Sequence, residues 1–289
     1  MKLHALVVVP LLTMLALLSG ARCYPAGSRI VIFVQGIYTT YDAGGTQSTL
    51  VEAHRFDTLK AAFRAKGYPA SSLLDFSYAG GTVTAAGAWQ PKDYPCELTD
   101  RTANDNLAPL EQMIRDERQR HPNAHFALVG HSLGGYLVFV EGAREAARAA
   151  SAKLAIDTVV TIEAPLKGVS PDKKTILDLV PCDKTYLAGA EIVAQKLDPL
   201  TSDVRKYQAA VMAQQGVRLA TLGNLADCFW NTAHCVGGAW VDDSATQFLE
   251  GQASVSRSYT IDAAPFASHD AILADRAATN DTVTFVGAP

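Results

Sequence analysis

A glycine-rich turn between a strand pattern and a helix pattern constrains this chain more than any other feature of its sequence. The segment reads Val129-Gly130-His131-Ser132-Leu133-Gly134-Gly135, which is G-x-S-x-G with one further glycine. The apolar run 125–129 predicts a strand before the turn, and 133–150 has the pattern of a helix after it. A serine in such a turn has strained backbone angles and an exposed hydroxyl. We therefore predict that Ser132 is a nucleophile, the alternative being a helix N-cap in a glycine-rich turn.

The rest of the chain alternates short apolar runs with helical patterns, which indicates a parallel sheet flanked by helices. Strands are expected over 29–34, 72–78, 125–129, 156–162, 216–222 and 255–261. Helices are expected around 56–63, around 107–114 with Pro109 in the first turn, over 133–150 and over 271–278. The stretch 79–100, rich in Gly, Pro and aromatic residues, is expected to be a loop.

About 50 residues separate the strand ending at Ile162 from the next one, which is more than a single crossover helix needs. Two interpretations of this insert, about 169–215, stay open. It is either a crossover helix with surface loops or a helical lid over a site.

Residues 1–21 have the pattern of a secretory signal peptide. Lys2 precedes an apolar run over 5–18, and Ser19-Gly20-Ala21 supplies the small residues of a cleavage site. The apolar run is shorter than the roughly 20 residues that span a membrane. We therefore expect a mature domain over 22–289 that is secreted or periplasmic. An uncleaved anchor and a lipid-modified Cys23 are the alternatives.

Five cysteines would then lie in an oxidising compartment, where disulfides form. Cys228 and Cys235 are close enough to close a small loop. Cys96 could pair with Cys182, which would leave Cys23 free. No pair has the C-x-x-C spacing of a zinc or redox site, so the sequence predicts no metal site.

The composition excludes one class of partner. The formal net charge is −4 and no run of Lys and Arg is present, so we expect no binding to nucleic acid.

Around Ser132 the sequence resembles the α/β-hydrolase family, and within it the secreted lipase and esterase branch. The resemblance extends over about 29–289. It implies a mostly parallel central sheet, a nucleophile elbow, and catalytic residues in the chain order serine, acid, histidine. It also implies an oxyanion hole formed by the backbone amides of Ile37 and Leu133. Family members often have His-Gly before the first of these, where this chain has Gln35-Gly36.

The resemblance places the catalytic histidine after the last strand, where His269 lies. The chemistry requires an imidazole within hydrogen-bond reach of Ser132, which takes its proton and returns it to the leaving group. His234, beside Cys235, is the alternative.

The acid should follow the preceding strand, and Asp227 fits that place. A carboxylate there would hold the imidazole tautomer and stabilise its protonated form. The alternatives are Glu163, directly after the strand 156–162, and Asp242 or Asp243.

The residues themselves predict acyl transfer, and the resemblance narrows it to ester hydrolysis. We expect a secreted serine hydrolase that cleaves small-molecule or lipid esters without a cofactor and touches a lipid surface transiently. The oligomeric state does not follow from the sequence. One alternative is a deacylase, thioesterase or amidase with the same triad. The other is a non-catalytic binding protein on the same scaffold.

Overall fold

The structure is a computed structural model that describes residues 28–42, 55–168, 188, 191, 194–195, 197–227, 249, 251–261 and 267–289. Several predictions therefore lie outside the described residues. They are the signal peptide, residues 169–187 of the expected lid, His234, Asp242 and Asp243, and the cysteines at 23, 182, 228 and 235. Both disulfide pairings remain predictions for this reason.

The described chain alternates strands with helices. The strands are β1 (Arg29–Val34), β2 (Leu73–Asp75), β3 (Gly81–Val83), β4 (Trp89–Pro91), β5 (His125–His131), β6 (Ile156–Ile162), β7 (Arg218–Asn224) and β8 (Val255–Tyr259). The α-helices are α1 (Asp57–Ala65), α2 (Ala103–Arg120), α3 (Leu133–Ala147), α6 (Thr201–Gln214), α8 (Ser268–Ala271) and α9 (Arg276–Val286). Short 3-10 helices cover Ala70–Ser72, Cys96–Asp100 and Ala150–Ala152.

Six of the described strands form one sheet in the order β2-β1-β5-β6-β7-β8. Every neighbouring pair in it is parallel, which confirms the predicted central sheet. Because all six strands run in the same direction, their carboxyl ends meet at one edge. Ligands of open α/β sheets bind at this edge.

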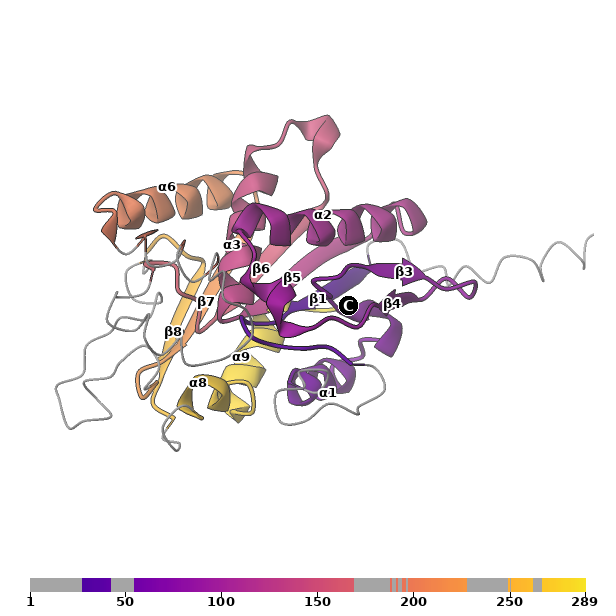
Figure 1. Cartoon of the computed structure of the whole chain (residues 1–289), viewed down its shortest axis with the longest axis horizontal. Coiled ribbons are helices and arrows are strands. Elements are labelled where there is room, and N and C mark those ends of the chain that lie inside the picture. Colours follow the sequence, from indigo (N-terminus) through magenta and orange to yellow (C-terminus); the bar gives the residue numbers. More distant parts are fainter. Residues whose placement is uncertain are drawn as a thin grey trace, which may run out of the picture.

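Helices cover both faces of the sheet (Figure 1). α2, α3 and α6 lie on one side, and α1, α8 and α9 lie on the other. β1 contributes to both cores, since Ile30 and Ile32 pack on the first side and Val31 and Phe33 on the second. A strand buried on both faces is a continuous apolar run rather than an alternating one, which is why its sequence predicted it so clearly.

The start of α2 differs from the prediction. The helix begins at Ala103, where the Thr102 side chain accepts a hydrogen bond from the amide of Asp105 and caps the end. Pro109 therefore lies inside the helix rather than in its first turn, and its missing N–H removes one helical hydrogen bond. Buried Leu107 and Leu110 on either side of it keep the helix packed on the sheet.

Two other segments contain more helices or strands than the sequence predicted. The expected loop 79–100 contains the antiparallel pair β3 and β4 and a 3-10 helix. The expected closing helix over 271–278 is two helices, α8 and α9. Asp275 separates them because its carboxylate accepts a 2.8 Å hydrogen bond from the amide of Ala278 and starts α9.

The described end of the expected lid is a crossover helix. α6 packs against α3 and leads into β7, with Ala209 and Met212 buried. A lid function for the remainder of 169–215 stays a prediction. Within the part of the chain that the structure describes, no helix has the length and hydrophobicity to cross a membrane.

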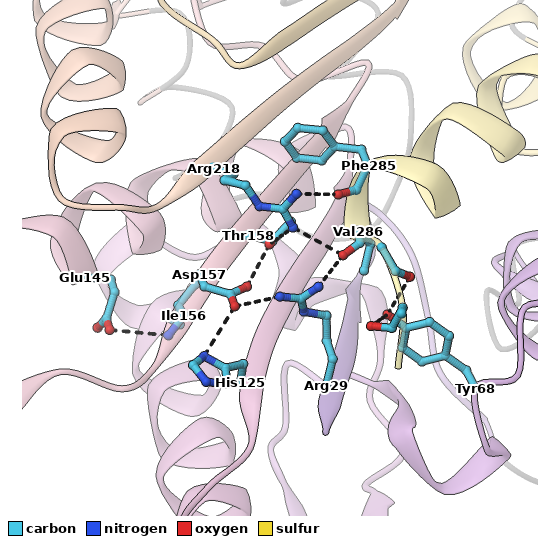
Figure 2. Close-up of polar contacts among 12 residues, drawn as sticks. Arg29, Tyr68, His125, Glu145, Ile156, Asp157, Thr158, Arg218, Phe285 and Val286 are labelled. Carbon is cyan, nitrogen blue, oxygen red and sulfur yellow. Dashed lines mark hydrogen bonds and ion pairs between the residues drawn. The ribbon is translucent and has the colours of Figure 1, made fainter. Parts of the chain in front are cut away.

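The amino ends of the strands carry a polar network that fixes α9 (Figure 2). Arg29 and Arg218 both donate to the carbonyl of Val286, the last residue of α9. Arg29 also pairs with Asp157 at 2.7 Å. Cations at a helix C-terminus bind its unpaired carbonyls and complement its dipole. This edge of the sheet is therefore occupied by structural contacts, whereas Ser132 lies at the opposite edge.

One carboxylate of α3 is buried completely. Glu141 is 0% exposed and lies 2.8 Å from Arg148. Burial raises the pKa of Glu141 to about 7, although the Arg148 charge acts in the opposite direction.

This pKa predicts a pH dependence of stability. The folded protein keeps a proton on Glu141 up to about pH 7, whereas the usual pKa of a glutamate side chain is 4.5. The stabilising contribution of the group is thus complete below its usual pKa and is lost as the pH rises toward 7. We expect the free energy of unfolding of the parent to fall by on the order of 2 kcal/mol more than that of Glu141→Gln across this window. Urea unfolding at several pH values measures this difference. The same change of unfolding free energy with pH in the two proteins would contradict the prediction.

Candidate active site

Ser132 occupies the strained turn that the sequence predicted. It lies between β5 and α3 with φ 55° and ψ −127°, and its amide donates a 2.9 Å hydrogen bond to the carbonyl of Ile162. A Cβ at Gly130 would lie 2.2 Å from the carbonyl oxygen of Gly134. The turn can therefore close only because position 130 has no side chain.

The loop after β1 passes directly beside the serine. A Cβ at Gly36 would lie 2.9 Å from Cβ and 3.3 Å from Oγ of Ser132. The structure thus places the predicted oxyanion-hole residue Ile37 next to a residue in contact with Ser132, and Leu133 is the first residue of α3. Leu133 thus follows the predicted nucleophile directly, and Ile37 is one residue away from the contact between Gly36 and Ser132.

Two buried tyrosines support this loop. The Tyr78 hydroxyl donates to the carbonyl of Gln35 at 2.6 Å, and the hydroxyls of Tyr94 and Thr39 are 2.9 Å apart. Thr39 also donates to the carbonyl of Gly36 at 2.9 Å. The rings of Tyr78 and Tyr94 belong to the hydrophobic core, so they position the loop.

The predicted acid and the predicted histidine lie in direct contact. Asp227 follows β7, His269 is in α8 after β8, and Oδ2 of the first is 2.7 Å from Nδ1 of the second. Asp227 is 1% exposed and His269 is 8% exposed. A carboxylate at Nδ1 orients the ring and stabilises its protonated form, while Nε2 is the atom that exchanges a proton with a serine.

Glu163, the alternative acid, lies close to this pair but is used differently. One carboxylate oxygen of Glu163, one of Asp227 and one ring nitrogen of His269 all lie within 4.8 Å of one another. The Glu163 carboxylate accepts a hydrogen bond from the backbone amide of Asn224, whereas His269 Nδ1 is bonded to Asp227. The geometry therefore favours Asp227 as the acid. The same three side chains could also hold a cation, but a cation at Nδ1 would displace the hydrogen bond to Asp227.

Three of the four described non-glycine residues with positive φ lie at this edge of the sheet, and the fourth, Ala155, directly precedes β6 at the other edge. Among the described residues, the non-glycine positions with positive φ are Tyr38, Ser132, Ala155 and Glu163. Tyr38 follows the loop beside the serine, and Glu163 follows β6 at the same edge of the sheet. Strained residues persist where the surrounding structure fixes them, and they cluster at functional sites.

His131 has a role that the sequence analysis missed. Its Nε2 is 3.0 Å from the backbone carbonyl of His269, and the two rings are 4.7 Å apart between centroids. Burial lowers the pKa of His131 well below its usual value, and the nearby His269 and Arg55 lower it further. The ring is therefore neutral, and its Nε2–H donates to that carbonyl. This contact ties the serine turn to the segment that carries His269.

Comparison with known proteins establishes the fold. Neither protein-family models nor curated protein sequences match the chain. Solved structures do match. One, from work on LipS and LipT, two metagenome-derived lipolytic enzymes, is 16% identical over 93% of this chain and 98% of that one, with a TM-score of 0.50. A highly thermostable carboxyl esterase from Bacillus coagulans is 12% identical over 91% of each chain, also with a TM-score of 0.50.

The chain has the α/β-hydrolase fold. A further match, phospholipase PlaB from Legionella pneumophila, is 14% identical with a TM-score of 0.44. The matched region covers 68% of this chain but only 38% of that protein. At these identities the matches establish the fold alone, and the chemistry has to be argued from the site.

The two carboxylates near His269 can be separated by matched substitutions. We expect Asp227→Asn to lower kcat on a short-chain chromogenic ester by about 10⁴-fold, because the amide favours the wrong imidazole tautomer. Glu163→Gln keeps an acceptor for the amide of Asn224, so we expect a loss of less than about tenfold. Steady-state kinetics of both variants measures this difference. If Glu163→Gln lowers kcat more than Asp227→Asn does, Glu163 is the acid instead.

Proposed function

We propose that this chain is a serine hydrolase that cleaves carboxylic esters through Ser132, His269 and Asp227. The observation that carries the proposal is the 2.7 Å contact between Asp227 and His269 at the sheet edge where Ser132 lies in a strained turn. These residues are far apart in the sequence and share no secondary structure element. Acyl transfer requires a nucleophilic hydroxyl, a base that takes its proton and an acid that orients the base. The three residues that could fill these roles lie at one edge of the sheet.

The proposed reaction has two halves. Ser132 Oγ attacks the ester carbonyl carbon while His269 Nε2 takes the hydroxyl proton, and the same proton then goes to the departing alcohol. Water next gives a proton to His269 and attacks the acyl-enzyme, and the protonated ring returns that proton to Ser132 as the carboxylic acid leaves. Asp227 stabilises the charged ring in both halves.

The negative oxygen of each tetrahedral intermediate needs hydrogen-bond donors. We assign this role to the amides of Ile37 and Leu133. The amino end of α3 also contributes the positive end of its dipole at this point. Fixed donors of this kind stabilise the developing charge without reorganising.

The proposed substrate class depends on the structural neighbours as well as on the site. Ester hydrolysis fits the names of the structural neighbours, which are lipolytic enzymes and a carboxyl esterase. A small-molecule or lipid ester is therefore the proposed substrate. Parallel assays on an ester, a thioester and an amide with the same acyl group separate this proposal from a thioesterase or an amidase.

Export remains part of the proposal. The sequence pattern of 1–21 supports cleavage before Arg22, and the mass of the mature N-terminus after expression in a secreting host tests it. The pairing Cys228–Cys235, a lid in 169–215 and contact with a lipid surface also remain proposals. Rates on soluble and emulsified esters test the last two together.

Replacing the nucleophile tests the proposal directly. We expect Ser132→Ala to lower kcat on a short-chain chromogenic ester by at least about 10⁴-fold, because the substitution removes the attacking oxygen. Ser72→Ala is the matched control, since Ser72 is also buried but its hydroxyl bonds to the carbonyl of Pro69 near β2. Turnover in Ser132→Ala equal to that of the control would contradict the proposal.

A further inference from the structure

We propose that Asn224 is a positioning residue that sets the distance between Asp227 and His269. The proposal rests on the proposed function, because it concerns the same acid and the same base. Asn224 is the last residue of β7 and is 1% exposed. Its side chain forms no part of the predicted triad, and the sequence analysis did not single it out.

The side-chain amide of Asn224 joins the two segments that carry the acid and the base. Its Oδ1 accepts from the amide of Ala226 at 3.1 Å and from the amide of Ile261 at 2.9 Å. Its Nδ2 donates to the carbonyl of Ile261 at 3.0 Å and to the carbonyl of Ser268 at 3.0 Å. An amide side chain offers two donor hydrogens and two acceptor sites, so all four are used.

Two of these four bonds, those to Ala226 and Ser268, end directly next to the functional side chains, and the other two hold Ile261 after β8. Ala226 directly precedes Asp227, whose own amide donates to the Asn224 carbonyl at 3.0 Å. Ser268 directly precedes His269. A change in the Asn224 side chain therefore moves the peptide before the acid and the peptide before the base, which changes the 2.7 Å contact between them.

The backbone of Asn224 is itself fixed by the two neighbouring strand ends. Glu163, which follows β6, accepts a hydrogen bond from its amide. On the other side, the amide of the next residue, Leu225, donates to the carbonyl of Tyr259 in β8 at 2.8 Å. The side chain is thus presented from a rigid point, which is what a positioning residue needs.

A purely structural role and a positioning role predict different results. Losing buried hydrogen bonds lowers stability in either case. A structural role leaves the kcat of the folded fraction unchanged. A positioning role lowers kcat at nearly constant KM, because misplacement by about 1 Å can reduce the rate by about 10²-fold.

The first experiment compares Asn224→Ala with Asn224→Asp. Asn224→Ala removes all four side-chain hydrogen bonds. Asn224→Asp keeps the shape of the side chain and the two hydrogen bonds that it accepts but loses the two that it donates. We expect kcat on the chromogenic ester to fall by about 10²-fold in Asn224→Ala and at least about tenfold in Asn224→Asp, with KM within about threefold of the parent. Asn224→Asp keeps the test valid if Asn224→Ala does not fold.

Asn106→Ala is the matched control. Asn106 is also 1% exposed, and its side chain donates to the carbonyls of Thr99 at 3.1 Å and Arg101 at 3.2 Å, but it lies in α2. We expect this variant to lower the thermal unfolding midpoint and to leave kcat within about twofold of the parent. Equal kcat values for Asn224→Ala and Asn106→Ala would overturn the proposal.

A second readout does not depend on turnover. The proton that His269 Nδ1 shares with Asp227 should give a low-field proton NMR resonance, assigned by its loss in Asp227→Asn. We expect this resonance to disappear or shift in Asn224→Ala and to persist in Asn106→Ala. An unchanged resonance in Asn224→Ala overturns the positioning role. Absence of ester turnover in a parent that shows the resonance overturns the proposed function instead.

Discussion

The close approach of α3 to β1 determines where the serine turn and the loop that follows β1 can lie. A Cβ at Gly134, in the first turn of α3, would be 2.2 Å from the carbonyl oxygen of Val34. Only glycine permits this distance, and the helix can then begin directly after β5. Ser132 is left in the turn with φ 55°, beside the loop that follows β1. The nucleophile, its predicted oxyanion donors and the amino end of the helix are gathered by this one contact.

The parts of the fold that the sequence predicted correctly are those with a strong local signal. β1 and β5 contain continuous buried apolar runs, 30–34 and 126–129, because both faces of the sheet are covered. The start of α2 was misplaced because its apolar pattern begins at Leu107, several residues after the polar cap at Thr102. β3 and β4 have three residues each, too few for a periodic pattern to emerge from a loop-like composition.

The site residues also divide into those with a signal in the sequence and those without one. Ser132 has a local signature, and Asp227 and His269 followed from chain order once the fold was recognised. The contacts of His131 and Asn224 have no such signature. His131 reaches a carbonyl 138 residues away and Asn224 reaches one 44 residues away, so both depend on how β5, β7 and the segment after β8 come together. Residues that position a site through backbone carbonyls leave no pattern in one sequence, because any residue can supply the carbonyl.

Covalent labelling is the most direct test of whether His269 activates the hydroxyl of Ser132. A fluorophosphonate reagent reacts with an activated serine and leaves an adduct that peptide mass spectrometry can locate. We expect one adduct, on Ser132, formed at least about 10³-fold more slowly in His269→Ala. Labelling at another residue, or equal labelling rates with and without the imidazole, would contradict this expectation.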